Sequence, residues 1–274
     1  ERKSNAEAIG AGRDPGFISD VNGEVWPEHI IEVQPVGSNS ANIVWEWHVW
    51  DHLIQDFDSS QANFGVVADH PELVDINFGR DGRADWLHAN AIDYNEEFDQ
   101  VLLSVPWFDE VWIIDHSTTT AEAAGHAGGN SGKGGDLLYR WGNPQAYDRG
   151  AAGDQQLFRP HGGHWIREGL PGAGNLLAFN NGTTRPDGAY STVEEVVLPV
   201  DANGFYTHPP SGVAFGPVTS LWTYAATPPE DLFSGGLSGA DRQPNGNTLI
   251  CEGRSGDFLE VTMGSNLAWR YINP

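Results

Sequence analysis

Two short polar segments of the sequence carry the side chains best suited to chemistry. His88 and Asn90 lie two residues apart, so in a regular strand they share one face. His161 and His164 are separated by two glycines, a spacing that predicts a β-bulge able to re-aim either ring. A neutral imidazole can act as a nucleophile or carry a proton. His88 and His161 are therefore candidate catalytic residues, and Asn90 and His164 are candidate substrate-binding residues.

A third polar segment, 238–242, ends in Arg242. A guanidinium binds oxyanions through charge-assisted hydrogen bonds, so Arg242 is a further catalytic candidate that would hold an anion beside the histidines. Two alternatives stay open. The imidazoles could hold Zn²⁺ or a similar ion, although Arg242 would repel a cation and no His-x-His pair is present. His88 and His161 could also serve only to hydrogen-bond neighbouring backbone.

A recurring aromatic phrase indicates which elements position these residues. The phrase closes a pattern of four short extended runs separated by turn residues, which is typical of a β-propeller blade. Its aromatic rings are expected to pack between neighbouring blades rather than to bind a ligand. The four copies are Trp45-Glu46-Trp47, Tyr139-Arg140-Trp141, Trp222-Thr223-Tyr224 and Trp269-Arg270-Tyr271.

The pattern predicts an all-β propeller of four-stranded antiparallel blades, of which about three and a half are visible. The innermost strand of each blade lines a central channel, so His88, His161 and Arg242 should converge there. The half blade would use 29–33 and 43–47. The complete blades would use 86–94, 101–105, 111–115 and 137–141; 161–166, 175–180, 193–198 and 218–224; and 239–242, 247–252, 258–261 and 267–271.

The whole chain, 1–274, is expected to form a single propeller domain with long insertions at about 50–83 and 118–136. Short helices are expected within 49–73. Propellers usually close with four to eight blades, because an open ring leaves unpaired strand edges. We therefore expect a missing N-terminal segment or a partner chain to supply the remaining blades.

Composition limits the partners of the chain. There are 14 basic against 38 acidic residues, a formal charge of −24, which repels nucleic acid and anionic lipid. No apolar run is long enough to span a membrane. These features favour a periplasmic or extracellular protein. The single cysteine, Cys251, excludes an intrachain disulfide and is expected to be a small buried side chain rather than a nucleophile.

Two further motifs are weaker. Asp75, Asn77 and Asp81 show the alternating oxygen ligands of a calcium loop, without the glycine and glutamate of an EF-hand, so a structural calcium is one hypothesis. The glycine-rich stretch 125–135 is similar to a phosphate-binding loop but departs from that motif at two positions. We expect it to be a loop between the third and fourth strands of its blade.

In its candidate site residues and its strand repeats the chain resembles the arylsulfotransferase family. The repeats of that family carry a His-x-Asn first strand, a Gly-Asn-x-Leu-Ile second strand and a closing aromatic strand. The likeness runs from about 24 to 274. The matching segments are Asp85-Trp86-Leu87-His88-Ala89-Asn90, Ile113-Ile114-Asp115-His116-Ser117-Thr118, Tyr139-Arg140-Trp141-Gly142-Asn143-Pro144 and Pro244-Asn245-Gly246-Asn247-Thr248-Leu249-Ile250.

The resemblance implies a six-bladed propeller, periplasmic or secreted, that needs no cofactor. Its activity would move a sulfuryl group from an aryl sulfate to a phenol through a sulfohistidine, with no nucleotide sulfate donor. His88 and His161 would be the channel histidines and Arg242 the anion clamp. Two departures are the glycines after His161 and the absence of a histidine on the last first strand. The alternative function is a non-catalytic secreted propeller that serves as a binding or structural module.

Overall fold

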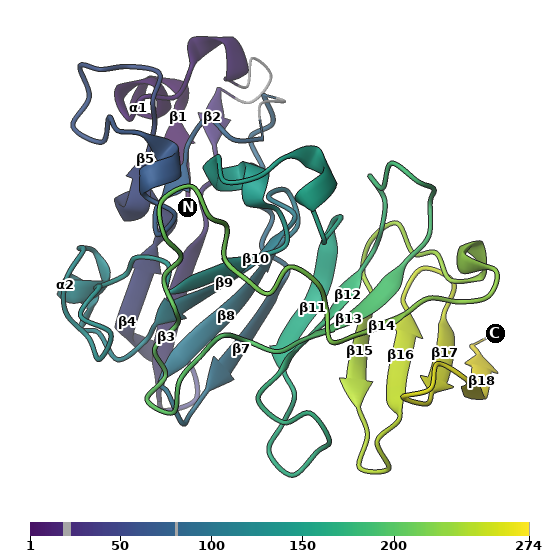
Figure 1. The fold of residues 1–274 in the computed structure, drawn as a ribbon. Helices are drawn as coiled ribbons and strands as arrows, with labels where there is room; N and C mark the ends of the chain where they lie inside the picture. Colours follow the sequence, from purple (N-terminus) through teal and green to yellow (C-terminus); the bar gives the residue numbers. More distant parts are fainter. Residues whose placement is uncertain (19–22, 80–81, 274) are drawn as a thin grey trace.

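Three four-stranded antiparallel sheets follow one another along the chain (Figure 1). The computed structural model describes residues 1–18, 23–79 and 82–273. The strands are, in the first sheet, β7 (Ala91–Asn95), β8 (Gln100–Val105), β9 (Glu110–Asp115) and β10 (Tyr139–Trp141); in the second, β11 (Pro160–Trp165), β12 (Leu176–Asn180), β13 (Thr192–Val196) and β14 (Trp222–Tyr224); and in the third, β15 (Gly239–Arg242), β16 (Thr248–Glu252), β17 (Asp257–Val261) and β18 (Leu267–Ile272).

These sheets confirm the three complete four-strand units expected from the sequence, and the half unit is the two-stranded sheet of β3 (His29–Val36) and β4 (Ser40–His48). Three strands begin two or more residues later than expected, namely β7, β10 and β14, and the delay is largest in β7. β7 starts at Ala91 rather than at residue 86, because Trp86 and Leu87 are buried in the core and His88 has a left-handed backbone, φ 57°. His88 therefore lies in the segment that leads into the strand.

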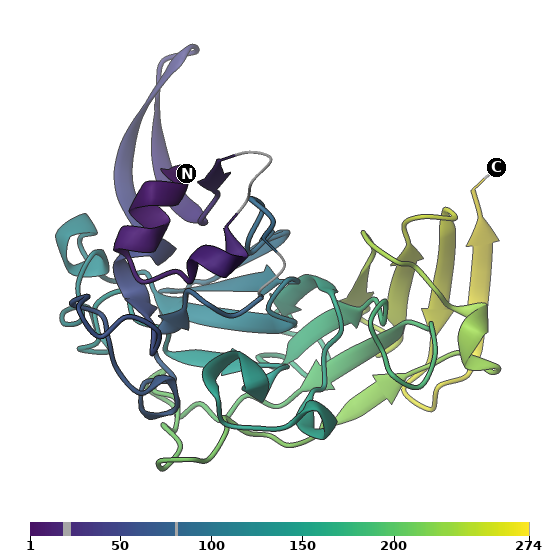
Figure 2. The same ribbon diagram turned by 90° about the horizontal axis from the view of Figure 1, so that it is seen from above.

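The sheets form an arc that the described residues do not close into a ring (Figure 2). Within the described chain, β3 pairs only with β4 and β18 pairs only with β17, so one edge of each is unpaired. The completion of the propeller by further blades stays a prediction. None of the helices in the described ranges is long and apolar enough to cross a bilayer.

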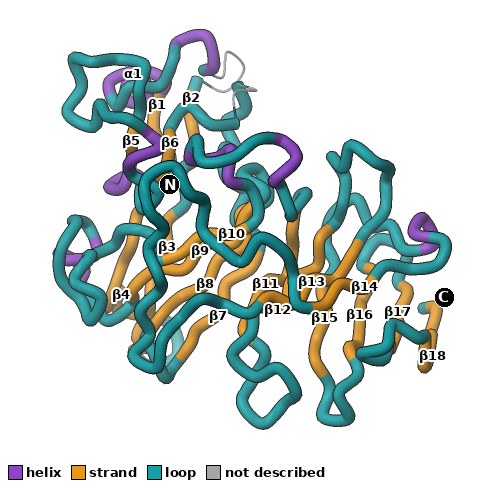
Figure 3. The backbone as a smooth tube through the Cα atoms, viewed as in Figure 1, coloured by secondary structure: helices purple, strands orange, loops and turns teal. Residues whose placement is uncertain are grey.

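The N-terminal segment and the insertions pack around the first sheet (Figure 3). The insertion at 50–83 has two short helical turns, as expected, but Leu53 and Ile54 pair with a parallel strand instead of extending a helix. The remaining elements are β1 (Lys3–Ser4), α1 (Asn5–Gly10), η1 (Pro15–Phe17), β2 (Glu24–Val25), η2 (Val49–His52), β5 (Leu53–Ile54), η3 (Val67–Asp69), β6 (Val74–Asp75), α2 (Thr120–Ala123), η4 (Pro144–Tyr147), η5 (Ala152–Asp154) and η6 (Pro229–Asp231).

The core lies within and between the sheets. Every residue of β8 and β9 is buried, as expected for strands covered on both faces. The outer-strand aromatics of the first two complete sheets and of the hairpin are largely buried, in agreement with a packing role. Trp269 and Tyr271 differ, with 49% and 46% of their surface exposed, because no sheet of the described chain packs over β18.

Two glycines let the second sheet approach its neighbours. Gly162 has φ 62° and marks the predicted bulge, where the pairing register shifts between His161 and His164. A side chain at Gly163 would place its Cβ 2.5 Å from Ser104 Oγ of the first sheet. The Gly163 N–H also donates to that hydroxyl at 2.9 Å. The glycines that depart from the family pattern thus have a steric reason.

Gly163→Ala is expected to lower the free energy of unfolding by about 1–3 kcal/mol, because the added methyl group overpacks a buried contact between sheets. Gly153→Ala is the control, since a Cβ at Gly153 meets no atom within 4 Å. Urea denaturation followed by tryptophan fluorescence measures both. Equal stability of the two variants would show that the first and second sheets can move apart at Gly163 and Ser104 without cost.

Candidate active site

His161 is fixed by a side-chain network that settles which ring nitrogen carries the proton. Its Nδ1 lies 2.7 Å from Asn181 Oδ1 and 3.2 Å from the carbonyl oxygen of Arg159. The Asn181 amide nitrogen donates to the carbonyls of Ser234 and Leu237, at 2.7 and 3.0 Å, so its oxygen must accept. Nδ1 is therefore the protonated nitrogen, and the lone pair is on Nε2, which has no hydrogen-bond partner among the described residues.

Burial lowers the pKa of His161 below its ordinary value of 6.5, against the raising effect of its hydrogen bonds to Asn181 and to the Arg159 carbonyl. The ring is thus neutral at and above neutral pH. Together with the exposed lone pair on Nε2, this is the state that a nucleophilic histidine requires.

This lowered pKa predicts the pH dependence of any reaction in which His161 is the nucleophile. The reactive form is the neutral one, so kcat/KM stays level above pH 6.5 and falls only as the pH drops through the lowered pKa. p-Nitrophenyl sulfate is the substrate to use from about pH 5 to pH 8, because nitrophenolate leaves without a proton. An activity that rises as the solution becomes more acidic would contradict the prediction.

His88 lies close enough to His161 for the charge on His88 to affect the titration of His161. Its Nδ1 is 2.5 Å from a carboxylate oxygen of Asp85, which orients the ring. The ring also contacts Trp107 in a tilted arrangement, with 5.6 Å between ring centroids. Half of the His88 side chain is exposed, so this dyad can exchange protons with solvent or a ligand.

Both histidines line one pocket of about 390 Å³. Loops of all three complete sheets build it, and two arginines take part. Arg159 stacks over Trp107, with Cζ 4.2 Å from the ring centroid, and donates to the carbonyl of Pro106 at 3.0 Å. Arg254 has no ion-pair partner within the described ranges. The lining residues are His88, Pro106, Trp107, Arg159, His161, Thr183, Thr184, Gly235, Gly236, Leu237 and Arg254.

The backbone around the pocket is unusual. His88, Arg159 and Leu237 all have left-handed conformations, with φ of 57°, 60° and 62°. Such conformations are uncommon outside glycine, and they persist where the surrounding structure enforces them, often at functional sites. The side chains of His88 and Arg159 are brought to the pocket by this backbone geometry.

Comparison with known proteins places the chain in a family. The sequence profile described as Arylsulfotransferase (ASST) matches residues 18–196, more than half of the chain and a range that includes both histidines. The chain belongs to the arylsulfotransferase family. None of the curated proteins matches it.

Among solved structures, the chain is similar to a protein of unknown function from Bacteroides caccae, with 12% identity and a TM-score of 0.40. The likeness covers 91% of this chain and 59% of that protein, so the chain spans about three fifths of the length of this relative. A similarity at this level carries no argument about the site.

Arg242 does not line the pocket of this arylsulfotransferase-family chain, in contrast to the sequence prediction. Its side chain is 1% exposed, and its Nη2 lies 2.5 Å from Glu195 Oε2 of the second sheet. Its Nη1 contacts the Met263 sulfur, and the guanidinium lies over Trp222. Arg242 thus neutralises a buried carboxylate between two sheets, and the arginines that face the histidines are Arg159 and Arg254.

The two predicted substrate-binding residues also lie outside the lining of this pocket. His164 Nδ1 is 2.9 Å from the Gly162 carbonyl, and its Nε2 is 3.6 Å from Asp241 of the third sheet. Asn90 donates to the carbonyl of Pro160 at 3.0 Å, which links the approach to β7 with the strand that carries His161. Both residues have contacts that connect sheets.

Four contributors to the site were missed by sequence reasoning: Trp107, Arg159, Asn181 and Arg254. Arg159 lies two residues before His161, so its closeness in sequence could have indicated that it belongs to the same site. Asn181 directly follows β12 at a sheet end, where polar side chains gather, but its partner cannot be read from spacing. Trp107 and Arg254 occupy turns between strands, whose direction only the folded chain reveals.

The calcium hypothesis meets a different arrangement. Asp75 Oδ1 accepts the N–H of Asn77 at 2.8 Å, and Asn77 Oδ1 accepts the N–H of Asp14 at 2.8 Å. These oxygens therefore hold the chain together through their own hydrogen bonds. Asp81 lies outside the described residues. The structural calcium stays a prediction.

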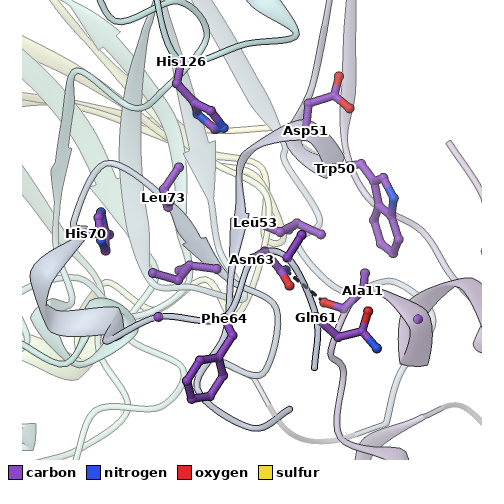
Figure 4. A pocket seen from close by; sticks show the side chains of 14 residues that line it. Ala11, Trp50, Asp51, Leu53, Gln61, Asn63, Phe64, His70, Leu73 and His126 are labelled. Carbon is purple, nitrogen blue, oxygen red and sulfur yellow. Dashed lines mark hydrogen bonds between the residues drawn. The ribbon is translucent and has the colours of Figure 1, made fainter. Parts of the chain in front are cut away.

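A larger pocket of about 540 Å³ lies between the N-terminal segment and the insertion at 50–83 (Figure 4). His126, His70 and Asp51 border it, and the Asn63 amide reaches the carbonyl of Ala11 at 3.0 Å. The described residues that line it include no arginine or lysine. Since a sulfate ester is an anion, the smaller pocket with two arginines suits it better.

Two other sequence predictions concern the glycine-rich stretch 125–135 and the single cysteine, Cys251. The stretch 125–135 does form a loop between β9 and β10. The Asp115 carboxylate accepts the Ser131 N–H at 2.8 Å, so this backbone N–H already has an anionic partner and is not free to bind a phosphate. Cys251 is only half-buried, on the second strand of its sheet. Burial raises the pKa of its thiol, which disfavours the nucleophilic thiolate.

Proposed function

We propose that this chain transfers a sulfuryl group from an aryl sulfate ester to a phenol, with His161 as the nucleophile. The observation that carries the proposal is the hydrogen bond from His161 Nδ1 to a fully constrained Asn181, which leaves the Nε2 lone pair exposed in a pocket with two arginines. Family membership supports the same chemistry.

The first step is attack of His161 Nε2 on sulfur. The bond between sulfur and the aryl oxygen breaks, its electron pair leaves with the phenolic oxygen, and an N–S bond forms. His88 in its imidazolium form, held by Asp85, donates a proton to the leaving oxygen. Arg159 and Arg254 interact with the negative oxygens of the transferring group.

The second step reverses the first with a new phenol. Neutral His88 accepts the proton of the acceptor hydroxyl, the phenolic oxygen attacks sulfur, and the N–S bond breaks to restore neutral His161. Trp107, Pro106 and Leu237 supply apolar surface for the aromatic rings of donor and acceptor. Arg254 also provides local positive charge in a protein whose formal charge is −24, whereas the charge of Arg159 is partly balanced by Asp109 Oδ1, 3.8 Å from its Nε.

Incubation with p-nitrophenyl sulfate and phenol, without any nucleotide sulfate, tests the proposal. Release of nitrophenol should increase with phenol concentration, and phenyl sulfate should accumulate in equal amount. Circular dichroism confirms that the protein assayed is folded. Release no faster than in a protein-free control would refute the enzyme proposal and favour a binding module on the same fold.

A further inference from the structure

A second cluster of histidines lies at the base of the β3–β4 hairpin and shares no residue with the sulfuryl pocket. His29 begins β3 and His48 ends β4, and the two are direct partners in the antiparallel register. Glu46 lies two residues before His48, on the same face of the strand. The hairpin therefore presents two imidazoles and a carboxylate side by side.

The three side chains converge on a single oxygen atom. Glu46 Oε2 lies 3.1 Å from His29 Nε2 and 3.4 Å from His48 Nε2. In a tetrahedral zinc site, bonds of about 2.0–2.1 Å to each ligand place the ligand atoms about 3.3 Å apart. All three ligand atoms here lie within 4.8 Å of one another, so the donor atoms already have nearly the spacing that zinc requires.

His48 lies between two carboxylates, a common setting for a metal-binding histidine. Its Nδ1 is 3.1 Å from Glu1 Oε2, and its Nε2 faces Glu46. A neutral imidazole has one N–H and one lone pair in the ring plane, so Nδ1 can donate to Glu1 while the Nε2 lone pair is directed toward Glu46. In this arrangement a metal ion can bind between Nε2 and Glu46, while Nδ1 donates to Glu1 as the outer carboxylate of a metal-bound histidine.

The surroundings also favour a cation. Glu1 and Glu46 contribute two carboxylates to this region, and the ammonium of Lys3 lies 2.6 Å from Glu1 Oε1. About a quarter of each imidazole side chain is exposed, 26% for His29 and 28% for His48, so water can complete the coordination.

We propose that His29, Glu46 and His48 form a zinc site that ties the N-terminal segment to the base of the hairpin. The rings now stack at 3.9 Å with 16° between their planes. Since imidazole lone pairs lie in the ring plane, the rings turn apart on binding while their Nε2 atoms stay near the metal. Two imidazoles and a carboxylate are ligands that suit zinc, and the remaining position is open to solvent.

A comparable group of His52, His126 and Asp136 is organised differently. Both Nδ1 atoms lie 2.7–2.8 Å from the same Asp136 oxygen, shorter than the ligand spacing around zinc. The second nitrogen of His52 is 2.8 Å from the Ala123 carbonyl. Hydrogen-bond contacts occur in both groups, since His29 Nε2 and Glu46 Oε2 lie 3.1 Å apart, but those of the His52 group are shorter and join the two insertions. The His52 group therefore serves as the internal alternative in the test.

Isothermal titration of the chelator-treated full chain with zinc chloride at neutral pH tests the proposal. The expected stoichiometry is one zinc per chain. His29→Ala and His48→Ala should each weaken binding by at least about 10-fold, and Glu46→Gln, which keeps the side-chain shape, should weaken it as well. Cobalt substitution should give the visible absorption of a tetrahedral site, and the histidine variants should lose it.

His70→Ala is the matched control, because His70 also contacts a glutamate, Glu72, at 3.0 Å but lies outside the cluster. It should bind zinc as the wild type does. Absence of stoichiometric zinc binding would overturn the proposal. Unchanged zinc affinity in folded His29→Ala and His48→Ala would overturn it too. Loss of zinc binding in His126→Ala instead would assign the ion to the group of His52, His126 and Asp136.

Discussion

His161→Ala is expected to lower the turnover of p-nitrophenyl sulfate by at least about 10³-fold, because it removes the atom that would form the N–S bond. The variant should fold normally. His161 is only partly buried, and the Asn181 amide keeps its donor bonds to the carbonyls of Ser234 and Leu237 after the ring is gone. The loss should therefore appear in kcat rather than in stability.

His164→Ala is the comparison variant, since His164 lies on the same strand three residues away and outside the lining of the pocket. It should retain most of the activity. Steady-state kinetics of both variants, with thermal unfolding as a check on folding, decides between the two histidines. If His164→Ala loses turnover while a folded His161→Ala keeps it, the nucleophile has been assigned to the wrong ring.

Arg242→Ala should lower the free energy of unfolding by about 3–5 kcal/mol, because it leaves the carboxylate of Glu195 buried without its counter-ion. Both side chains are almost completely inaccessible, at 1% and 2% exposure, and Glu195 also accepts a hydrogen bond of 2.7 Å from Asn175. Activity of the folded protein should change little, since Arg242 does not line the pocket.

The double variant Arg242→Met with Glu195→Gln removes both charges and keeps an acceptor for Asn175. It should recover most of the lost stability, because a buried ion pair can often be replaced by neutral groups at little cost. Urea denaturation measures the stability of the three proteins, and nitrophenol release measures their activity. A stable Arg242→Ala variant with strongly reduced turnover would instead restore the anion-clamp role predicted from the sequence.

The strands could be predicted because their signal is local and repeated. Alternating or continuous apolar runs between turn residues identified all three complete sheets and the hairpin. The start of β7 could not be predicted, since His88 adopts a left-handed backbone that interrupts an otherwise extended pattern. The glycines at 162 and 163 did indicate the bulge, but their role in the approach of the sheets depends on Ser104, nearly sixty residues away.

The site was only partly predictable, because its side chains meet through contacts between sheets rather than through a local sequence pattern. The repeat predicted that His88 and His161 approach each other, and both do line one pocket; their catalytic role stays a prediction. Arg242 was misjudged because it shares a strand face with the buried Ala240, and its partner Glu195 comes from another sheet. Arg254 lies in a turn, where sequence spacing says nothing about the direction of the side chain. Contacts between sheets, which decide burial and pairing, leave no periodic trace in the sequence.

The most direct measurement is the mass of the protein after exposure to p-nitrophenyl sulfate in the absence of an acceptor. The account predicts one added sulfuryl group per chain, mapped by peptide fragmentation to His161, and its loss when phenol is supplied. A sulfuryl group on another residue would contradict transfer through His161. So would nitrophenol release without any modified protein, when rapid quenching has stopped breakdown of the adduct.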